Sequence, residues 1–287
     1  MASLFPQPCP ELPEYGSLIL KGPYHASAPV HLLLSHALAN PDAKAILLTP
    51  NRASFKAALV DLNDEWLDHN SGHGRVASAS RRTEIFYPPT LAHLRLLLSM
   101  LHEYDTMVHH EKTTLDVAPS LLVLHEISSY FDTASSETTV SAYLSVISSA
   151  LALTNSWSPR HPGKASKLVV FDSGLTDLKL PILRPLSFED QTHDIQRHRD
   201  ALSVLLERYF EWRADAQVHE EARLAPGEDQ TEDNEGEASP RVARSLSIQR
   251  CRGGEDGEGV VWHWTEVEHV RENSRPYTTF HWNEPES

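Results

Sequence analysis

Short apolar runs alternate with longer segments of helical spacing through the first 175 residues, and this alternation constrains the fold more than any other feature. The apolar runs contain almost no polar residue, as in Leu121–Leu124, which is typical of parallel strands buried on both faces. The longer segments space their apolar residues three or four apart, as a helix does when one face packs against a core. We therefore predict an α/β fold over residues 16–175, with a mostly parallel central sheet and helices on both faces.

The pattern predicts five strands and four helices in this region. The expected strands are Ser17–Lys21, Ala45–Thr49, Thr83–Tyr87, Ser120–Leu124 and Lys167–Phe171. The expected helices are Val30–Leu38, Ala53–Leu67, Leu91–Tyr104 and Thr138–Trp157. Thr90 immediately precedes the third helix and suits its N-terminal cap. Residues 68–82 and 105–117 are polar, and we expect both to be loops.

The C-terminal part of the chain has a different pattern. Residues 198–210 are expected to be helical. The alternation of apolar and polar residues from Trp212 to Val218 predicts a strand with one solvent-exposed face. The runs Ser245–Gln249 and Val260–Trp264 flank a glycine-rich turn, which predicts a β-hairpin. His263 lies between two tryptophans and should point outward if both tryptophans face the core.

The whole chain is expected to form one domain with irregular additions. Residues 1–15 hold four prolines and form an irregular arm, and residues 16–218 form the core. Residues 219–240 hold eight acidic residues against one base, which is typical of a disordered acidic loop. Residues 241–270 form a C-terminal hairpin of the same domain, and residues 271–287 form a tail.

Two surfaces are expected to dock a partner. One is the exposed edge of the C-terminal hairpin. The other is the arm, because it is too short to fold alone and yet carries four apolar residues: Leu4, Phe5, Leu12 and Tyr15.

Composition excludes several classes of protein. The chain has 25 basic and 40 acidic residues and a net charge of −15, which disfavours a dedicated nucleic-acid-binding domain. Its two cysteines, Cys9 and Cys251, cannot form a disulfide framework or a zinc site of four thiolates. Because the chain has no run of 18 apolar residues and no secretory signal, we expect a nuclear or cytosolic protein without membrane contact.

The segment between the first strand and the first helix is where an ATP-binding P-loop would lie. A P-loop needs the pattern Gly-x-x-x-x-Gly-Lys-Ser/Thr. Gly22 fits, but Ser27 replaces the second glycine, Ala28 the lysine and Pro29 the hydroxyl residue. The charge partner and the metal ligand of ATP are both missing, and Pro29 also lacks an N–H. We interpret the segment as a structural turn, and ATP with magnesium stays an alternative.

Two further nucleotide-handling positions are also degenerate. The fourth strand ends where a magnesium-holding aspartate would lie, but His125 occupies that position and Glu126, which follows, should point to the other side of the strand. The second strand ends in Pro50–Arg52, without the glutamate that some ATPases of this architecture have there. We therefore predict no catalytic residue and no confident cofactor-binding residue.

Histidine is abundant, with 17 residues, but we predict no metal site. One stretch has metal-ligand residue types without a spacing that places two of them on one helical turn: His102, Glu103, His109, His110 and Glu111. Two groups of basic residues are expected to form a solvated rim, although the second could contact a phosphate backbone. They are Arg75, Arg81 and Arg82 in one loop, and Arg241, Arg244, Arg250 and Arg252 around the hairpin.

Three stretches of the chain resemble a known family. They are Ile85–Thr90 followed by Leu91–Leu98 and His102–Glu103, then Ala118–Leu124 running on to Tyr130–Phe131, and finally Leu206–Phe210 before a strand. Together with the order of elements they span roughly residues 16–265. In these stretches the chain resembles the SWIM-domain-protein-associated recombinase paralogue, which is the RecA-fold subunit of the Shu complex.

This resemblance implies a RecA-like P-loop NTPase fold and a nuclear protein of homologous-recombination DNA repair. It implies two partners, a SWIM zinc-domain protein and the recombinase, with single-stranded DNA contacted through the complex. The best-known animal member has an intact P-loop and an aspartate at positions where this chain has Ala28, Pro29 and His125. The resemblance therefore implies a pseudo-ATPase without a cofactor, a non-catalytic accessory subunit that supports recombinase filament assembly.

Other interpretations stay open. An Elongator-type scaffold subunit in tRNA modification would also have a RecA fold without nucleotide motifs, and an atypical ATPase would use Glu126. An unrelated α/β enzyme would have convergent polar groups at the carboxyl ends of its strands. Phe55–Ala58 matches the Phe-x-x-Ala form by which recombinases dock on their neighbours, but it lies in an expected helix, so we predict that Phe55 packs in the core.

Overall fold

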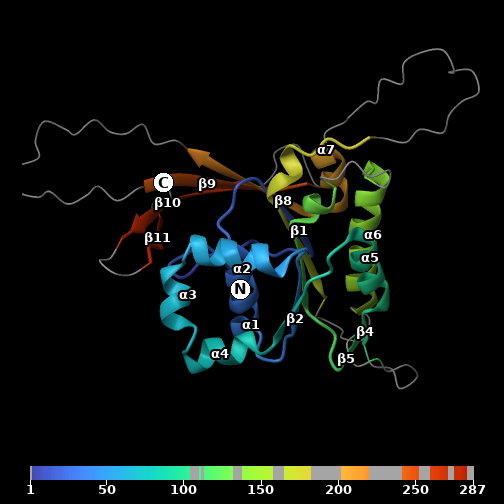
Figure 1. Ribbon diagram of the computed structural model, residues 1–287, viewed down its shortest axis with the longest axis horizontal. Helices are drawn as coiled ribbons and strands as arrows, with labels where there is room; N and C mark the ends of the chain where they lie inside the picture. Colours follow the sequence, from blue (N-terminus) through green and yellow to red (C-terminus); the bar gives the residue numbers. More distant parts are fainter. Residues whose placement is uncertain are drawn as a thin grey trace, which may run out of the picture.

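The computed structural model shows a nine-stranded mixed sheet with helices on both faces (Figure 1). The structure describes residues 2–103, 110, 113–131, 138–157, 165–181, 202–219, 241–251, 259–270 and 275–282. The expected acidic loop, apart from His219, lies outside these residues, as do parts of the expected segments 105–117, 198–210 and 271–287. Within the described residues no helix is long and apolar enough to cross a membrane.

Six strands form the parallel part of the sheet and confirm the fold class. They are β1 (Ser17–Lys21), β2 (Ala45–Leu48), β3 (Thr83–Phe86), β6 (Leu121–His125), β7 (Lys167–Asp172) and β8 (Trp212–His219). Their order across the sheet is β3-β2-β6-β7-β1-β8, and each neighbouring pair is parallel. The loop after β1 and the carboxyl ends of β2 and β6 therefore lie at one edge of the sheet, where open α/β sheets bind ligands.

An antiparallel extension continues the sheet beyond β8. β9 (Arg241–Arg250) and β10 (Gly259–His269) form the predicted hairpin, with longer strands than expected. β11 (Tyr277–Trp282) is a further strand in the segment expected to be a tail. Because β11 pairs with β10, it covers the hairpin edge that the sequence suggested as a docking surface. His263 is exposed between two buried tryptophans, as predicted.

Helices cover the sheet on both sides (Figure 1). One side carries α1 (Ala28–Ala39), α2 (Arg52–Asp61), α3 (Glu65–Asn70) and α4 (Gly74–Ser80). The other side carries α5 (Leu91–Met100), α6 (Val140–Trp157) and the short α7 (Leu202–Leu206). The side chain of Thr90 caps α5, as predicted, by accepting a hydrogen bond from the His93 amide. A separate short pair is formed by β4 (His102–Glu103) and β5 (Thr114–Leu115).

Two predictions about the segment between β2 and β3 are wrong. The expected helix Ala53–Leu67 is divided into α2 and α3, because Asp64 leaves the helical conformation and caps α3 by accepting a hydrogen bond from the Leu67 amide at 3.1 Å. The expected loop 68–82 contains the helix α4. Its polar sequence concealed a helix that buries only two side chains.

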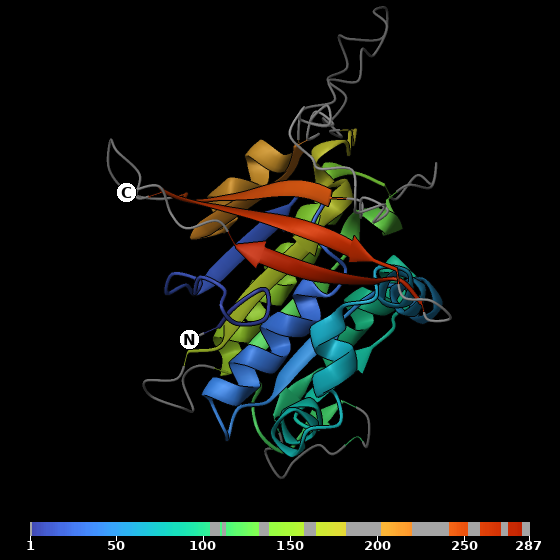
Figure 2. The same cartoon turned by 90° about the vertical axis from the view of Figure 1, so that its left-hand side faces the viewer.

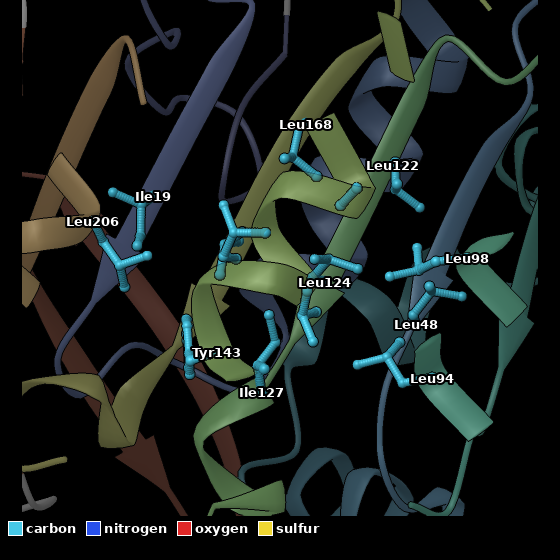
Figure 3. Close-up of a cluster of buried hydrophobic side chains, with 14 of the residues drawn as sticks. Ile19, Leu48, Leu94, Leu98, Leu122, Leu124, Ile127, Tyr143, Leu168 and Leu206 are labelled. Atoms are coloured by element: carbon cyan, nitrogen blue, oxygen red, sulfur yellow. The ribbon is translucent and has the colours of Figure 1, made fainter. Parts of the chain in front are cut away.

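Both faces of the sheet are buried, which explains the uninterrupted apolar strands. Alternate residues of β6 point to opposite faces. Leu122 and Leu124 contact the core beneath α5 and α6, whereas Leu121 and Val123 contact the core beneath α1. Figure 3 shows the first of these cores, where side chains from the sheet and from α5 and α6 pack together.

The arm of residues 1–15 packs against the antiparallel extension, and Figure 2 shows this blue segment beside the red strands. Its four apolar side chains are buried within the chain itself, each at most 4% exposed: Leu4, Phe5, Leu12 and Tyr15. Three aromatic rings surround the ring of Phe5 at centroid distances of 5.0, 5.0 and 5.4 Å: Trp264, Phe280 and Trp282. The prediction that these arm residues face a partner is therefore wrong, because the unexpected strand β11 helps to cover them.

Candidate functional site

The loop after β1 lies where a phosphate-binding loop would lie, but contacts inside the protein determine its shape. Gly22 has a φ of +87°, in the left-handed region that favours glycine. A Cβ at this position would lie 2.2 Å from the carbonyl oxygen of Ala216 in β8. The close approach of β8 therefore requires this glycine, independently of any phosphate.

Several amides that a P-loop would direct at phosphate are bonded within the loop. The Ala28 N–H donates to the His25 carbonyl at 3.0 Å, and the Ser27 N–H donates to Nδ1 of His25 at 3.2 Å. The Tyr24 N–H donates to a carbonyl two residues earlier at 3.0 Å, and Pro29 has no N–H. The loop has thus lost much of the array of free donors that binds phosphate.

Ser27, at the position of the second P-loop glycine, belongs to a buried polar cluster. Its hydroxyl donates to Oδ2 of Asp64 at 2.6 Å, and Nε2 of His31 lies 2.6 Å from the same oxygen. Burial would raise the pKa of Asp64, but the hydrogen bonds from His31 and Ser27 outweigh it and hold this pKa below its usual value. The sequence analysis missed this cluster, although an acidic pair at Asp64–Glu65 is a recognisable helix start.

The antiparallel strands hold the same loop from another side. Arg244 of β9 donates from Nη1 to the Pro23 carbonyl at 2.6 Å, and its Nε lies 2.7 Å from Oε2 of Glu266 in β10. The ring of His25 packs edge-on against Phe280 of β11, with 4.9 Å between centroids. Arg244 is therefore a structural ion-pair residue, and the prediction that it lies in a solvated rim is wrong.

Tyr24 and Glu126 meet across the carboxyl ends of β1 and β6. The Tyr24 hydroxyl donates a hydrogen bond to Oε1 of Glu126, and burial together with the Glu126 carboxylate raises the pKa of Tyr24 well above its usual value. Ser173 donates to Oε1 of Glu126 from its amide at 3.2 Å and to Oε2 from its hydroxyl at 2.8 Å. Tyr24 and Glu126 thus close the space between the loop after β1 and strand β6.

The orientation of Glu126 corrects a prediction. Strand alternation places His125 and Glu126 on opposite sides, but the backbone of Glu126 is left-handed, with a φ of +51°. The strand ends at His125 for this reason, and both side chains line one cavity.

His125 occupies the position of the magnesium-holding aspartate. Its Nδ1 lies 2.9 Å from Oγ1 of Thr49, and its ring packs edge-on against Phe55, with 5.1 Å between centroids. Burial lowers the pKa of His125 to about 4, so the ring is neutral at pH 7 and cannot supply the negative charge that magnesium needs. Phe55 is buried in the core, as predicted.

A further buried carboxylate, Asp172, ends β7. Its Oδ2 accepts hydrogen bonds from the Tyr143 hydroxyl at 2.6 Å and from the Ser128 amide at 3.0 Å. Burial raises the pKa of Asp172 to about 7. The sequence analysis missed this residue because the expected strand ends one residue earlier. Asp172 is fully buried, so it joins α6 to the turn after β6 and does not face a ligand.

A cavity of about 840 Å³ lies over the carboxyl ends of β2 and β6, and we call it the β2–β6 cavity. After β2 the chain leads to α2 on one face of the sheet, and after β6 it leads to the opposite face. Such a divergence is where open α/β sheets bind ligands. The lining includes His125, Glu126 and four aromatic side chains: Tyr24, Phe55, Tyr87 and Tyr130.

The other candidate residues do not form a site. Among the described residues there is no group of three or more potential metal ligands. His109 and Glu111 of the metal-like stretch lie outside the described residues, as does Arg252, and His102 bonds through Nδ1 to a backbone carbonyl at 2.8 Å. Arg82 donates to a carbonyl of α1 at 2.7 Å and so supports helix packing.

Comparison with known proteins gives matches among solved structures alone. No family model matches the sequence, and no curated protein matches it. Among solved structures, the crystal structure of the RadB recombinase is similar to this chain with a TM-score of 0.46 and 14% sequence identity. The similarity covers 87% of this chain and 87% of that one.

Proposed function

We propose that this protein is a RecA-fold accessory subunit without ATPase activity, which acts in a Shu-type complex that supports recombinase filament assembly in homologous-recombination DNA repair. The absence of ATPase activity is inferred mainly from the loop after β1, because the amides of Tyr24, Ser27 and Ala28 and the Ser27 hydroxyl are bonded within the protein. The proposed role in a Shu-type complex rests on the sequence resemblance at Ile85–Leu98, Ala118–Leu124 and Leu206–Phe210.

The geometry of the loop supports the loss of nucleotide chemistry. A working site needs a lysine for the phosphate charge, a hydroxyl for magnesium and a carboxylate at the carboxyl end of another strand of the sheet. Ala28, Pro29 and His125 hold these positions; Ala28 is buried and Pro29 lies in the first turn of α1. Each change weakens the hold on MgATP, and together they remove every charged group that the motif supplies.

A RecA-like fold without nucleotide chemistry acts through its surfaces. The proposed partners are a SWIM zinc-domain protein and the recombinase, with single-stranded DNA contacted through the complex and not by this chain alone. The net charge of −15 supports DNA contact through the complex and not by this chain alone, because an acidic chain is not attracted to the negatively charged phosphate backbone. The proposed location is the nucleus, and the proposed subunit has no cofactor.

Nucleotide binding tests the proposed absence of ATPase activity. Isothermal titration of MgATP into the purified full chain is expected to show no saturable binding at millimolar nucleotide. One observation favours an atypical ATPase instead: Glu126 lines the β2–β6 cavity. Saturable binding that Glu126→Gln abolishes would establish that alternative and overturn the proposal.

Partner identity tests the proposed role in a Shu-type complex. Affinity purification of the tagged full chain, followed by mass spectrometry, is expected to recover a SWIM-domain protein or the recombinase. Recovery of Elongator subunits would assign the chain to tRNA modification and overturn the Shu-type role without changing the fold. Recovery of no specific partner would overturn the accessory function itself.

A further inference from the structure

The β2–β6 cavity has the composition of a protein-docking site. Its volume of about 840 Å³ exceeds that of any single side chain. Its centre is buried and aromatic, with Phe55 packed against His125, whereas Asn51, Arg52 and Ser54 at its rim are exposed. A buried aromatic centre within an exposed polar rim is the usual anatomy of a protein–protein contact, and tyrosine and arginine are enriched in such contacts.

The rim of the cavity is basic although the chain as a whole is acidic. Arg52 lines the cavity, and its guanidinium lies over the Tyr87 ring, 6.0 Å from its centroid. Arg52 is in no ion pair with a described residue. The acid in the cavity wall, Glu126, has both oxygens hydrogen-bonded. The rim thus offers one unpaired positive charge, that of Arg52, to an incoming acidic group.

We propose that the β2–β6 cavity binds a short segment of a partner protein that carries an aromatic side chain beside an acidic residue. The aromatic ring enters among Phe55, Tyr87 and Tyr130, and the acidic residue pairs with Arg52 at the rim. This inference rests on the proposed function, because it names the chemistry by which an accessory subunit holds its partner.

A random dodecapeptide library displayed on phage tests this inference without knowledge of the partner. The library is panned on the immobilised full chain. We expect the enriched sequences to share an aromatic residue within two positions of Asp or Glu. Enrichment of sequences without this pair, or no enrichment over the bare support, overturns the proposal.

Three variants of α2 then localise the binding of an enriched, fluorescein-labelled peptide by fluorescence polarisation. Ala58 lines the cavity, so Ala58→Trp fills it and should abolish binding. Ala57 is exposed and does not line the cavity, so Ala57→Trp is the matched control and should bind as wild type does. Arg52→Glu reverses the rim charge and should weaken binding about tenfold. Circular dichroism confirms that each variant folds, and equal binding by wild type and Ala58→Trp overturns the proposal.

The same variants distinguish this inference from the proposed function. Shu-type partners that co-purify with wild type and Ala57→Trp but not with Ala58→Trp would support both. Partners that co-purify equally with wild type, Ala57→Trp and Ala58→Trp would support the function and overturn the inference. Peptide binding that depends on Ala58, without any co-purified partner, would support the cavity and overturn the function. A small molecule retained in the cavity, detected by native mass spectrometry of wild type and absent from Ala58→Trp, would overturn the peptide assignment.

Discussion

Phe5 attaches the arm to the antiparallel extension through a cluster of aromatic rings. Its side chain is 2% exposed and its ring lies within 5.4 Å, between centroids, of three aromatic rings of β10 and β11. Truncation of a buried phenylalanine to alanine costs about 3–5 kcal/mol, which includes the cavity left behind. We expect Phe5→Ala to lower the free energy of unfolding by about 4 kcal/mol, a large share of the 5–15 kcal/mol that is typical of a folded domain.

Equilibrium unfolding in urea, followed by tryptophan fluorescence, measures this loss. Two of the rings around Phe5 are tryptophans, so the emission of the native protein should shift as well. Phe5→Leu is the matched control, because it keeps an apolar side chain of similar volume and should cost less than about 1.5 kcal/mol. A loss below about 1 kcal/mol for Phe5→Ala, with an unchanged dependence on urea, would show that the arm is not part of the core.

Three further substitutions test the loop after β1 and two buried titratable groups. Gly22→Ala places a Cβ 2.2 Å from the Ala216 carbonyl oxygen in a left-handed backbone, so we expect a loss of about 2 kcal/mol or more in urea; unchanged stability would contradict the close approach of β8. The folded pKa of Asp172, about 7, lies above its usual value of 3.8, so its contribution to stability is complete below pH 3.8 and is lost as the pH rises toward 7. Asp172→Asn keeps an acceptor for Tyr143 and should gain about 4 kcal/mol over wild type between pH 4 and pH 7, at 1.36 kcal/mol per pH unit; parallel pH profiles would refute this. Burial lowers the pKa of His36 from 6.5 to about 4, so its contribution is present above pH 6.5 and is lost as the pH falls. His36→Gln should flatten the decline in unfolding free energy between pH 6.5 and pH 4, and an equally steep decline would refute the assignment.

The sequence predicts the fold best where the local pattern and the tertiary environment agree. The apolar run of β6 is buried on both faces, and Thr90 caps α5 through a contact only three residues away. The break between α2 and α3 was missed because apolar spacing fits one continuous helix there, whereas the cap at Asp64 interrupts it. That cap is held by Ser27, a contact across 37 residues that no local pattern contains.

The candidate site, like the fold, was predictable only where a local sequence pattern determines it. The loss of the P-loop residues can be read directly from Ala28 and Pro29, because the motif is contiguous. The contacts that hold the loop after β1 cannot be predicted from a local pattern, since Arg244 reaches the Pro23 carbonyl across 221 residues. The position of Glu126 was missed for a different reason: strand alternation holds only while the strand continues, and its left-handed backbone ends β6.

The aromatic cluster around Phe5 also has a consequence for biosynthesis. A ribosome adds Phe5 long before it adds Trp282, yet the two rings lie 5.4 Å apart in the finished protein. Until β11 has emerged, the apolar side chains of the arm lack part of their cover and are open to chaperones. A nascent chain that stops short of β11 therefore keeps apolar side chains of the arm partly uncovered, and quality-control factors can recognise them. Only a chain that has been translated through β11 can surround the ring of Phe5 completely.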